Sequence, residues 1–220
     1  GCHIDYYGIV TSGLTFAVDA GYAPSYPQSG LTWYDLTKNG NNPTFSSTLQ
    51  FSTAFASGGT INMSASNTVN VTATGTNLTA STYTYCAFVF LGSTGNPATP
   101  IIGQTATGGI PGPGIWGTTV GGAFGFNSIS LPTMSAYTGA WKYIVGVQDA
   151  TTQYLYVNGS LITSSAATIS ASSTLYICSG SSGAAKWNAT RMGSFQIYNR
   201  ALSTSEITQN YNVLKTRFGL

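Results

Sequence analysis

The sequence predicts an all-β fold: a two-sheet antiparallel sandwich with one short C-terminal helix. Many short apolar segments are separated by turn-forming residues at regular intervals, a pattern typical of sandwiches. Only the last residues of the chain show a convincing helical period. With 220 residues and no internal repeat, the chain has the size of one all-β domain with a substantial core.

The first half of the chain contains five predicted strands. Leu14, Phe16 and Val18 alternate with polar or small residues, which predicts a first strand over Leu14–Ala20. Tyr83–Leu91 is the strongest apolar run and is predicted to be a central strand. Three shorter strands are predicted between these two: Leu49–Phe51, Thr60–Met63 and Val69–Thr74.

The second half begins with a segment rich in structure-breaking residues. Asn96–Gly114 contains four prolines and many glycines and is predicted to be a long loop. Asn158-Gly159 is the strongest hairpin signal and predicts a two-residue type I′ turn. The predicted strands of this half are Ile115–Trp116, Ala123–Asn127, Lys142–Gln148, Gln153–Val157 and Thr174–Cys178.

The end of the chain changes from a strand period to a helical period. Alternating polarity predicts a half-buried strand over Gly193–Tyr198. Ser203-Thr204-Ser205-Glu206 is a capping box, in which the Ser203 hydroxyl accepts from the Glu206 N–H and the carboxylate reaches back. The helix that follows is predicted over Thr204–Arg217, with Gly219 at its end. Its apolar face consists of Ile207, Tyr211, Leu214 and Phe218.

Charged residues make up 5% of the chain, against a usual ~25%. The net charge of +2 and the scattered cations exclude a phosphate-binding stripe, so no nucleic-acid partner is expected. No apolar run approaches the ~18 residues of a membrane span, and no secretion signal is visible in residues 1–12, which are expected to form an N-terminal arm. A nearly uncharged polar surface suits a protein held in many copies in an assembly.

The three cysteines give no metal or disulfide framework. Cys86 and Cys178 lie in apolar strand segments and are expected to be small, buried, free residues. A Cys86–Cys178 disulfide is the alternative, although the spacing gives it no support. Cys2 and His3 are neighbours in the N-terminal arm, and one Cys with one His is a poor metal site.

The five acidic residues are spread too widely for glycoside hydrolysis. A retaining mechanism needs two carboxyl groups about 5 Å apart, usually clustered on one strand. No two acids lie within ten residues of each other, and Glu206 already has a capping role. The single histidine near the terminus also argues against a Ser-His-Asp triad. The sequence therefore predicts no catalytic residues and a protein that is not an enzyme. The acids are Asp5, Asp19, Asp35, Asp149 and Glu206.

Calcium is the one cofactor that the acidic residues leave open. The ion needs about six to eight oxygen ligands, typically with more than one carboxylate. Asp19, Asp35 and Asp149 are the plausible donors, but nothing in the sequence brings them together. The alternative is that they accept hydrogen bonds from turns, as Asp35 would from the turn that follows it. We therefore expect no cofactor.

Aromatic side chains are the candidate ligand-binding groups, because sugar rings stack on them. Trp116, beside the predicted Gly/Pro-rich loop, is the aromatic most expected to be exposed, although a packed position is about as plausible. Tyr22 and Tyr26 lie in the loop after the first strand and are further stacking candidates. Trp33 is expected to pack in the core or at a corner.

Three stretches carry a resemblance to a known family. They are G-I-V-T-S-G-L-T-F-A-V-D-A-G with W-Y-D-L-T-K-N-G-N-N near the start, W-K-Y-I-V-G-V-Q-D followed by L-Y-V-N-G, and F-Q-I-Y-N-R-A-L-S-T-S-E-I at the end. Together they resemble concanavalin A-like, laminin-G-like jelly-roll domains, of the variety common in tailed-phage virion proteins. The resemblance implies one jelly-roll domain over residues 13–220. It also implies that strand Gly193–Tyr198 pairs near strand Leu14–Ala20, with the helix packed outside.

The resemblance implies three classes of function. The favoured one is a non-catalytic virion structural protein of a tailed phage, such as a capsid decoration, head fibre or tail appendage. Its partners would be other virion proteins and neutral glycans on a surface to which it attaches. The alternative is a carbohydrate-binding module of a secreted or cell-surface bacterial protein. The third, an enzyme, is disfavoured by the acidic residues.

Overall fold

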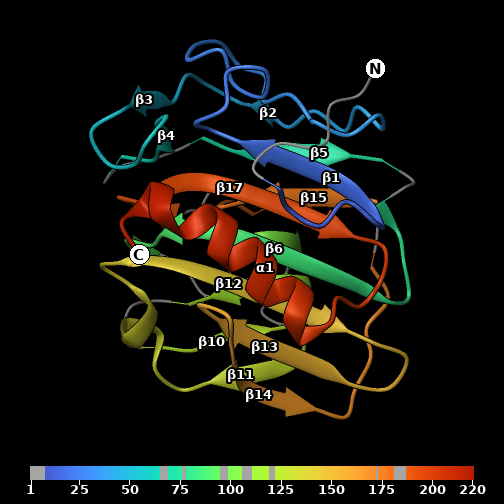
Figure 1. The fold of residues 1–220 in the computed structure, drawn as a ribbon. Helices are drawn as coiled ribbons and strands as arrows, with labels where there is room; N and C mark the ends of the chain where they lie inside the picture. Colours follow the sequence, from blue (N-terminus) through green and yellow to red (C-terminus); the bar gives the residue numbers. More distant parts are fainter. Residues whose placement is uncertain are drawn as a thin grey trace.

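The computed structural model describes residues 8–64, 69–75, 78–94, 99–105, 111–118, 122–171, 173–180 and 187–220. These residues form a sandwich of two antiparallel sheets with one α-helix on an outer face, as the sequence predicts (Figure 1). Cys2, His3 and Asp5 lie outside the described residues. The described part of the expected arm is packed, since Ile9 and Val10 are buried beside the C-terminal helix.

One sheet has eight strands. Seven follow one another in the order β14-β13-β12-β6-β17-β4-β3, and β1 pairs with β17 on the same side as β4. Their bounds, in that order, are Ser160–Ser165, Gln153–Val157, Trp141–Gln148, Tyr83–Phe90, Arg191–Tyr198, Thr60–Asn62 and Gln50–Ser52, with β1 at Leu14–Asp19.

The second sheet has seven strands in the order β11-β10-β9-β8-β15-β5-β2. Their bounds are Ile129–Leu131, Phe124–Phe126, Pro111–Gly117, Thr99–Thr105, Thr174–Ile177, Val71–Thr74 and Thr44–Phe45. A two-stranded ribbon joins β7 (Ser93–Thr94) to β16 (Trp187–Asn188), and a short 3-10 turn, η2, spans Met134–Tyr137.

The main core fills the space between the two sheets. Trp33 is fully buried there and meets Phe195 edge-on, with ring centroids 5.8 Å apart, so its predicted packed position is confirmed. Aromatic pairs of this geometry add stability beyond the area that they bury. Large members of this core also include Phe16, Tyr83, Tyr85, Phe124, Phe126 and Trp187.

A second core lies on the outer face of the eight-stranded sheet, under helix α1 (Thr204–Leu214) and the 3-10 turn η3 (Lys215–Phe218). In Figure 1 the red helix crosses β17, β6 and β12. Phe218 stacks on Phe88 of β6, with ring centroids 4.1 Å apart. The capping box predicted from the sequence is present, and Gly219 ends the last turn with φ 74°. No helix in the described segments is long and apolar enough to cross a membrane.

The pairing of the first and last strands is confirmed. Val18 of β1 lies opposite Phe195 of β17, in an antiparallel register that runs from Leu14↔Tyr198 to Asp19↔Ser194. The Asn158-Gly159 turn is also confirmed, since both residues have positive φ, at 51° and 82°.

The predicted loop Asn96–Gly114 is wrong where the structure describes it, while residues 96–98 and 106–110 lie outside the described residues. Strands β8 and β9 occupy Thr99–Thr105 and Pro111–Gly117 and pair with each other. Two irregularities in the register, between Pro100 and Ile102 and between Gly103 and Thr105, accommodate residues that break a regular ladder. Tertiary pairing therefore overrides the local preference for a loop.

Candidate ligand-binding face

The outer face of the seven-stranded sheet is the candidate site. Leu175 and Ile177 of β15 and Val71 and Ala73 of β5 belong to the core between the sheets. Because side chains alternate across a strand, the residues between them point to the opposite, outer face. The residues on this outer face are therefore Thr72 and Thr74 of β5 and Thr174 and Tyr176 of β15.

Four hydroxyl side chains form a row across the strands of this face. Thr72 lies opposite Tyr176 on β15 and opposite Thr44 on β2. Thr44 is bridged in turn to Thr32, so the row extends past the edge strand. We call Thr32, Thr44, Thr72 and Tyr176 the hydroxyl row. Directly opposite residues share a face and lie about 4.5–5.5 Å apart at Cβ, so the four hydroxyl groups follow one line perpendicular to the strands.

A second pair lies beside the hydroxyl row, where Thr74 is opposite Thr174. All six side chains are exposed or half-buried. Within the described part of the chain, none of the six hydroxyls makes a side-chain hydrogen bond, so each remains free to bind a ligand. The surface has donors and acceptors together, because a hydroxyl group can act as either.

The strands of this sheet carry no charged residue at all. A charged ligand would find no opposite charge on these strands. A neutral polar ligand could bind without the cost of desolvating a charged group. The face is therefore chemically matched to an uncharged, hydroxyl-bearing partner.

A surface pocket of about 390 Å³ lies at the edge of this face. The side-chain Oδ1 of Asn42 accepts from the Asp35 backbone N–H at 2.8 Å, which leaves the Asn42 Nδ2 group available as a donor. The pocket is lined by Gly40, Asn42, Thr44, Thr72, Ala73 and Thr74. Two members of the hydroxyl row thus line a concave feature that also offers an amide donor.

Two of the three predicted stacking residues are buried: the expected exposure of Tyr26 is wrong, and Trp116 takes the packed position that was its alternative. Tyr26 is 1% exposed and packs on Phe45, while Trp116 is 7% exposed and donates from Nε1 to the Asn127 carbonyl oxygen at 2.9 Å. A ring enclosed in this way has no open face for a sugar. Tyr22 is half-buried against the core under α1 and retains a partly accessible surface.

The three aspartates predicted as weak calcium donors have separate structural roles. Asp19 is buried in an ion pair with Arg217. Burial raises the pKa of the Asp19 carboxyl, and the Arg217 guanidinium opposes this rise. Asp35 accepts from backbone N–H groups of Ala17, Thr37 and Asn41, as predicted for a turn residue. Burial raises the pKa of Asp35, and these hydrogen bonds act against it.

Asp149 closes a surface turn. Its Oδ1 accepts from the backbone N–H groups of Thr151 at 2.9 Å and Thr152 at 2.8 Å, and the first of these bonds is the main reason that its pKa is lowered. Among the residues that the structure describes, no group of three His, Cys, Asp or Glu residues is placed to hold a metal ion. The structure does not bring Asp19, Asp35 and Asp149 together.

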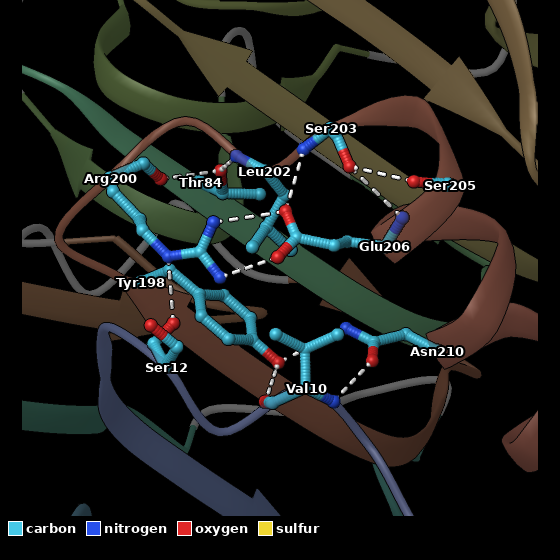
Figure 2. A network of polar contacts seen from close by, with 10 residues as sticks. All are labelled: Val10, Ser12, Thr84, Tyr198, Arg200, Leu202, Ser203, Ser205, Glu206 and Asn210. Atoms are coloured by element: carbon cyan, nitrogen blue, oxygen red, sulfur yellow. Dashed lines mark hydrogen bonds and ion pairs between the residues drawn. The ribbon is translucent and has the colours of Figure 1, made fainter.

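Glu206 belongs to a polar network that fastens the helix to the sheet, shown in Figure 2. Its carboxylate accepts from both terminal nitrogens of Arg200, at 2.9 and 2.7 Å, and from the Ser203 backbone N–H at 2.8 Å. Arg200 in turn donates from Nε to the Ser12 carbonyl oxygen. The Arg200 hydrogen bonds lower the pKa of Glu206 to about 2. The contacts of this carboxylate thus cap the helix and connect it, through Arg200, to the segment before β1.

Among the described residues, Cys86 and Cys178 are free and buried, as expected, and they do not form the alternative disulfide. Burial raises the pKa of the Cys86 thiol to about 12 and raises that of Cys178 as well. A thiol held in its neutral form is a poor nucleophile, so neither side chain is a candidate reactive group.

The comparisons with known proteins agree with this architecture. A family model described as the concanavalin A-like lectin/glucanases superfamily, Laminin_G_3, matches residues 62–208. No curated protein sequence matches the chain.

Solved structures of similar fold come from larger proteins. Trypanosoma rangeli sialidase in complex with sialic acid superposes with a TM-score of 0.65 and 17% identity over 92% of this chain and 33% of the other. The binding domain of Paraclostridial Mosquitocidal Protein 1 gives 0.64 and 17% over 91% and 52%. The receptor binding domain of botulinum neurotoxin type G gives 0.61 and 16% over 92% and 51%. The chain thus spans between a third and about half of these structures, and identities this low establish the fold alone.

Proposed function

Because this chain belongs to the concanavalin A-like lectin/glucanases superfamily, we propose that it is a non-catalytic attachment domain that binds neutral glycans. The proposal rests on one observation: the outer face of the seven-stranded sheet is uncharged and presents six free hydroxyl groups beside a pocket. Glycans are themselves rich in hydroxyl groups, so the two surfaces complement each other without ion pairs.

The absence of catalysis is part of the proposal and rests on the engaged carboxylates. Asp19, Asp35, Asp149 and Glu206 each have their own structural partners. Retaining glycosidases need two carboxyl groups that face one substrate bond. Among the described residues, each carboxylate is therefore engaged in a turn, a helix cap or a buried ion pair, and no two are left to act on one substrate bond.

We place this attachment domain on the virion of a tailed phage, as a capsid decoration, head fibre or tail appendage. The support is the resemblance of the first and last strands, with the capping box, to virion proteins of this kind. The low share of charged residues, 5%, also supports this location, because a protein with little charge repulsion to prevent association is suited to an assembly. In many copies, weak glycan contacts also gain strength through effective concentration.

A glycan array tests the binding proposal. The full chain, displayed in many copies on a bead or scaffold, should bind neutral glycans, and a Thr72→Lys variant should bind much less because it places a charged side chain in the hydroxyl row. A parallel assay for reducing ends released from the bound glycans should show no turnover. Turnover, or an array with no bound glycan, would refute the proposal.

The location needs a separate experiment. Antibodies against the chain should label particles in electron micrographs at a defined place on the head or tail. Recovery of the protein from the culture medium or the bacterial surface, with unlabelled particles, would instead favour a carbohydrate-binding module of a secreted or cell-surface protein.

A further inference from the structure

We infer that the hydroxyl row is a track for an extended, neutral, β-1,4-linked polysaccharide that lies across strands β2, β5 and β15. This inference rests on the proposed glycan binding and deepens it, because it specifies a polymer rather than a terminal sugar. The observation behind it is the straight register Thr32↔Thr44↔Thr72↔Tyr176.

The spacing of the row matches such a polymer. Neighbouring strands lie about 4.7–4.9 Å apart, and a pyranose unit in an extended β-1,4-linked chain advances by a similar length. A chain laid across the strands therefore meets one hydroxyl of the row per sugar unit. Three intervals separate Thr32 from Tyr176, so the row accommodates about four units.

The two ends of the row differ in accessibility. Beyond Tyr176 the same line enters Gly103 and then Gly114, which are both buried, so the accessible row ends at Tyr176. At the other end, Leu31 and Tyr34 flank the Thr32 segment and are 47% and 45% exposed. A polymer longer than the row can therefore continue over accessible apolar surface at the Thr32 end.

The chemistry of the side chains suits the two kinds of surface on a sugar. Each threonine offers a hydroxyl that both donates and accepts, and a methyl group that can contact sugar C–H groups. Tyr176 adds an aromatic ring at the end of the row. Its apolar ring can contact sugar C–H groups, and its hydroxyl can form a hydrogen bond. The pocket next to Thr44 and Thr72 provides room for a substituent that projects from the chain.

A series of oligosaccharides of increasing length tests the inference. Binding of the full chain to cello-, xylo- and manno-oligosaccharides of one to six units would be measured by calorimetry. We expect no measurable binding of monosaccharides, about a three- to tenfold gain for each added unit in the series that binds, from one net hydrogen bond per unit, and a plateau at about four units.

Two variants connect the length dependence to the row. Thr44→Val and Thr72→Val remove a hydroxyl while keeping side-chain shape and strand preference, and together they should weaken hexasaccharide binding by about tenfold or more. Thr163→Val is the matched control, because Thr163 is half-buried on β14 of the other sheet. This substitution should leave the affinity unchanged. Unchanged melting temperatures would show that all variants are folded.

The outcomes separate this inference from the broader proposal. A monosaccharide that binds as tightly as a hexasaccharide, or a double variant with normal affinity, would overturn the track while glycan binding stands. The same holds if the array shows glycans bound but none of the three oligosaccharide series binds. If neither the array nor any oligosaccharide series shows binding, the proposed function fails together with the track.

Discussion

Arg217 and Asp19 form a buried ion pair that joins the last turn of the chain to the end of the first strand. Arg217 Nη2 donates to Asp19 Oδ1 at 2.8 Å, Nη1 contacts Oδ2, and the two side chains are 7% and 0% exposed. The Asp19 carboxylate also accepts from the Gly21 backbone N–H. The sequence predicts Arg217 at the end of the C-terminal helix, but the carboxylate that it contacts is 198 residues away along the chain.

Removing one partner of this pair should be costly. Arg217→Met should lower the free energy of unfolding by about 3–5 kcal/mol, because the Asp19 carboxylate would remain buried without compensation. Chemical denaturation at neutral pH measures the loss. The double variant Asp19→Asn with Arg217→Met should recover part of it, and a single variant that costs less than about 1 kcal/mol would contradict the prediction.

Acid should weaken the attachment of the helix through Glu206. The pKa of this carboxyl is lowered from 4.5 to about 2 in the folded protein, chiefly by Arg200. A depressed carboxyl pKa stabilises the fold above the unfolded value and loses this effect as the pH falls through the folded value. The stabilisation should therefore be complete above about pH 5 and fade towards pH 2.

Glu206→Gln provides the comparison. Its melting temperature should be below that of the parent at pH 7, and the two should converge as the pH approaches 2. Curves that stay parallel from pH 7 to 2 would show that the carboxylate contributes nothing through its charge. Glycan binding should be the same for both proteins, since Glu206 lies on the helix side of the sandwich.

The N-cap should contribute measurably to stability. Ser203→Ala removes the acceptor for the Glu206 backbone N–H, a hydrogen bond of 3.3 Å, and should cost about 0.5–2 kcal/mol. Ser164→Ala, on the exposed edge strand β14, is a suitable control and should change stability by less than about 0.5 kcal/mol. Equal effects of the two substitutions would argue against the cap.

The buried thiols should be unreactive in the folded state. In a Cys2→Ser background, a thiol reagent should modify neither Cys86 nor Cys178 at pH 8, because both are buried and the pKa of Cys86 is raised to about 12. Both should react after denaturation. Rapid labelling of one thiol under native conditions would mean that its strand opens or is less enclosed than described.

Close packing between β8 and β9 should make Gly114 hard to replace. Its φ is 132°, and a Cβ added there would lie 2.4 Å from the Gly103 Cα. Gly114→Ala should therefore cost at least about 2 kcal/mol through strain and overlap. Gly139→Ala separates the two effects, because Gly139 has φ 75° but nothing within 4 Å. It should cost about 1 kcal/mol.

Local signals predicted the helix and the hairpin, because a capping box or an Asn-Gly turn acts within a few residues. The same logic failed for β8 and β9, where local composition indicates a loop, but the two strands pair with each other and β8 also pairs with the distant β15. It failed again for Tyr26 and left the exposure of Trp116 undecided, since composition cannot tell which aromatic residues a fold encloses.

The hydroxyl row could not be found from the sequence at all. Thr32, Thr44, Thr72 and Tyr176 are separated by stretches that cross to other parts of the sandwich and back. Only the strand order and the register place them on one line. In a chain this rich in threonine, no single member of the row differs from its neighbours until the pairing is known.

Strand β17 has a consequence for how the protein is made. It is the shared partner of β6, β1 and β4, and it is synthesised after all three. Until β17 has been synthesised, apolar β6 has an open edge, and β1 lacks the strand with which it pairs in the described sheet. Such edges invite association between chains. The eight-stranded sheet can therefore be completed only after β17 has left the ribosome, and until then these edges are open to association with other chains.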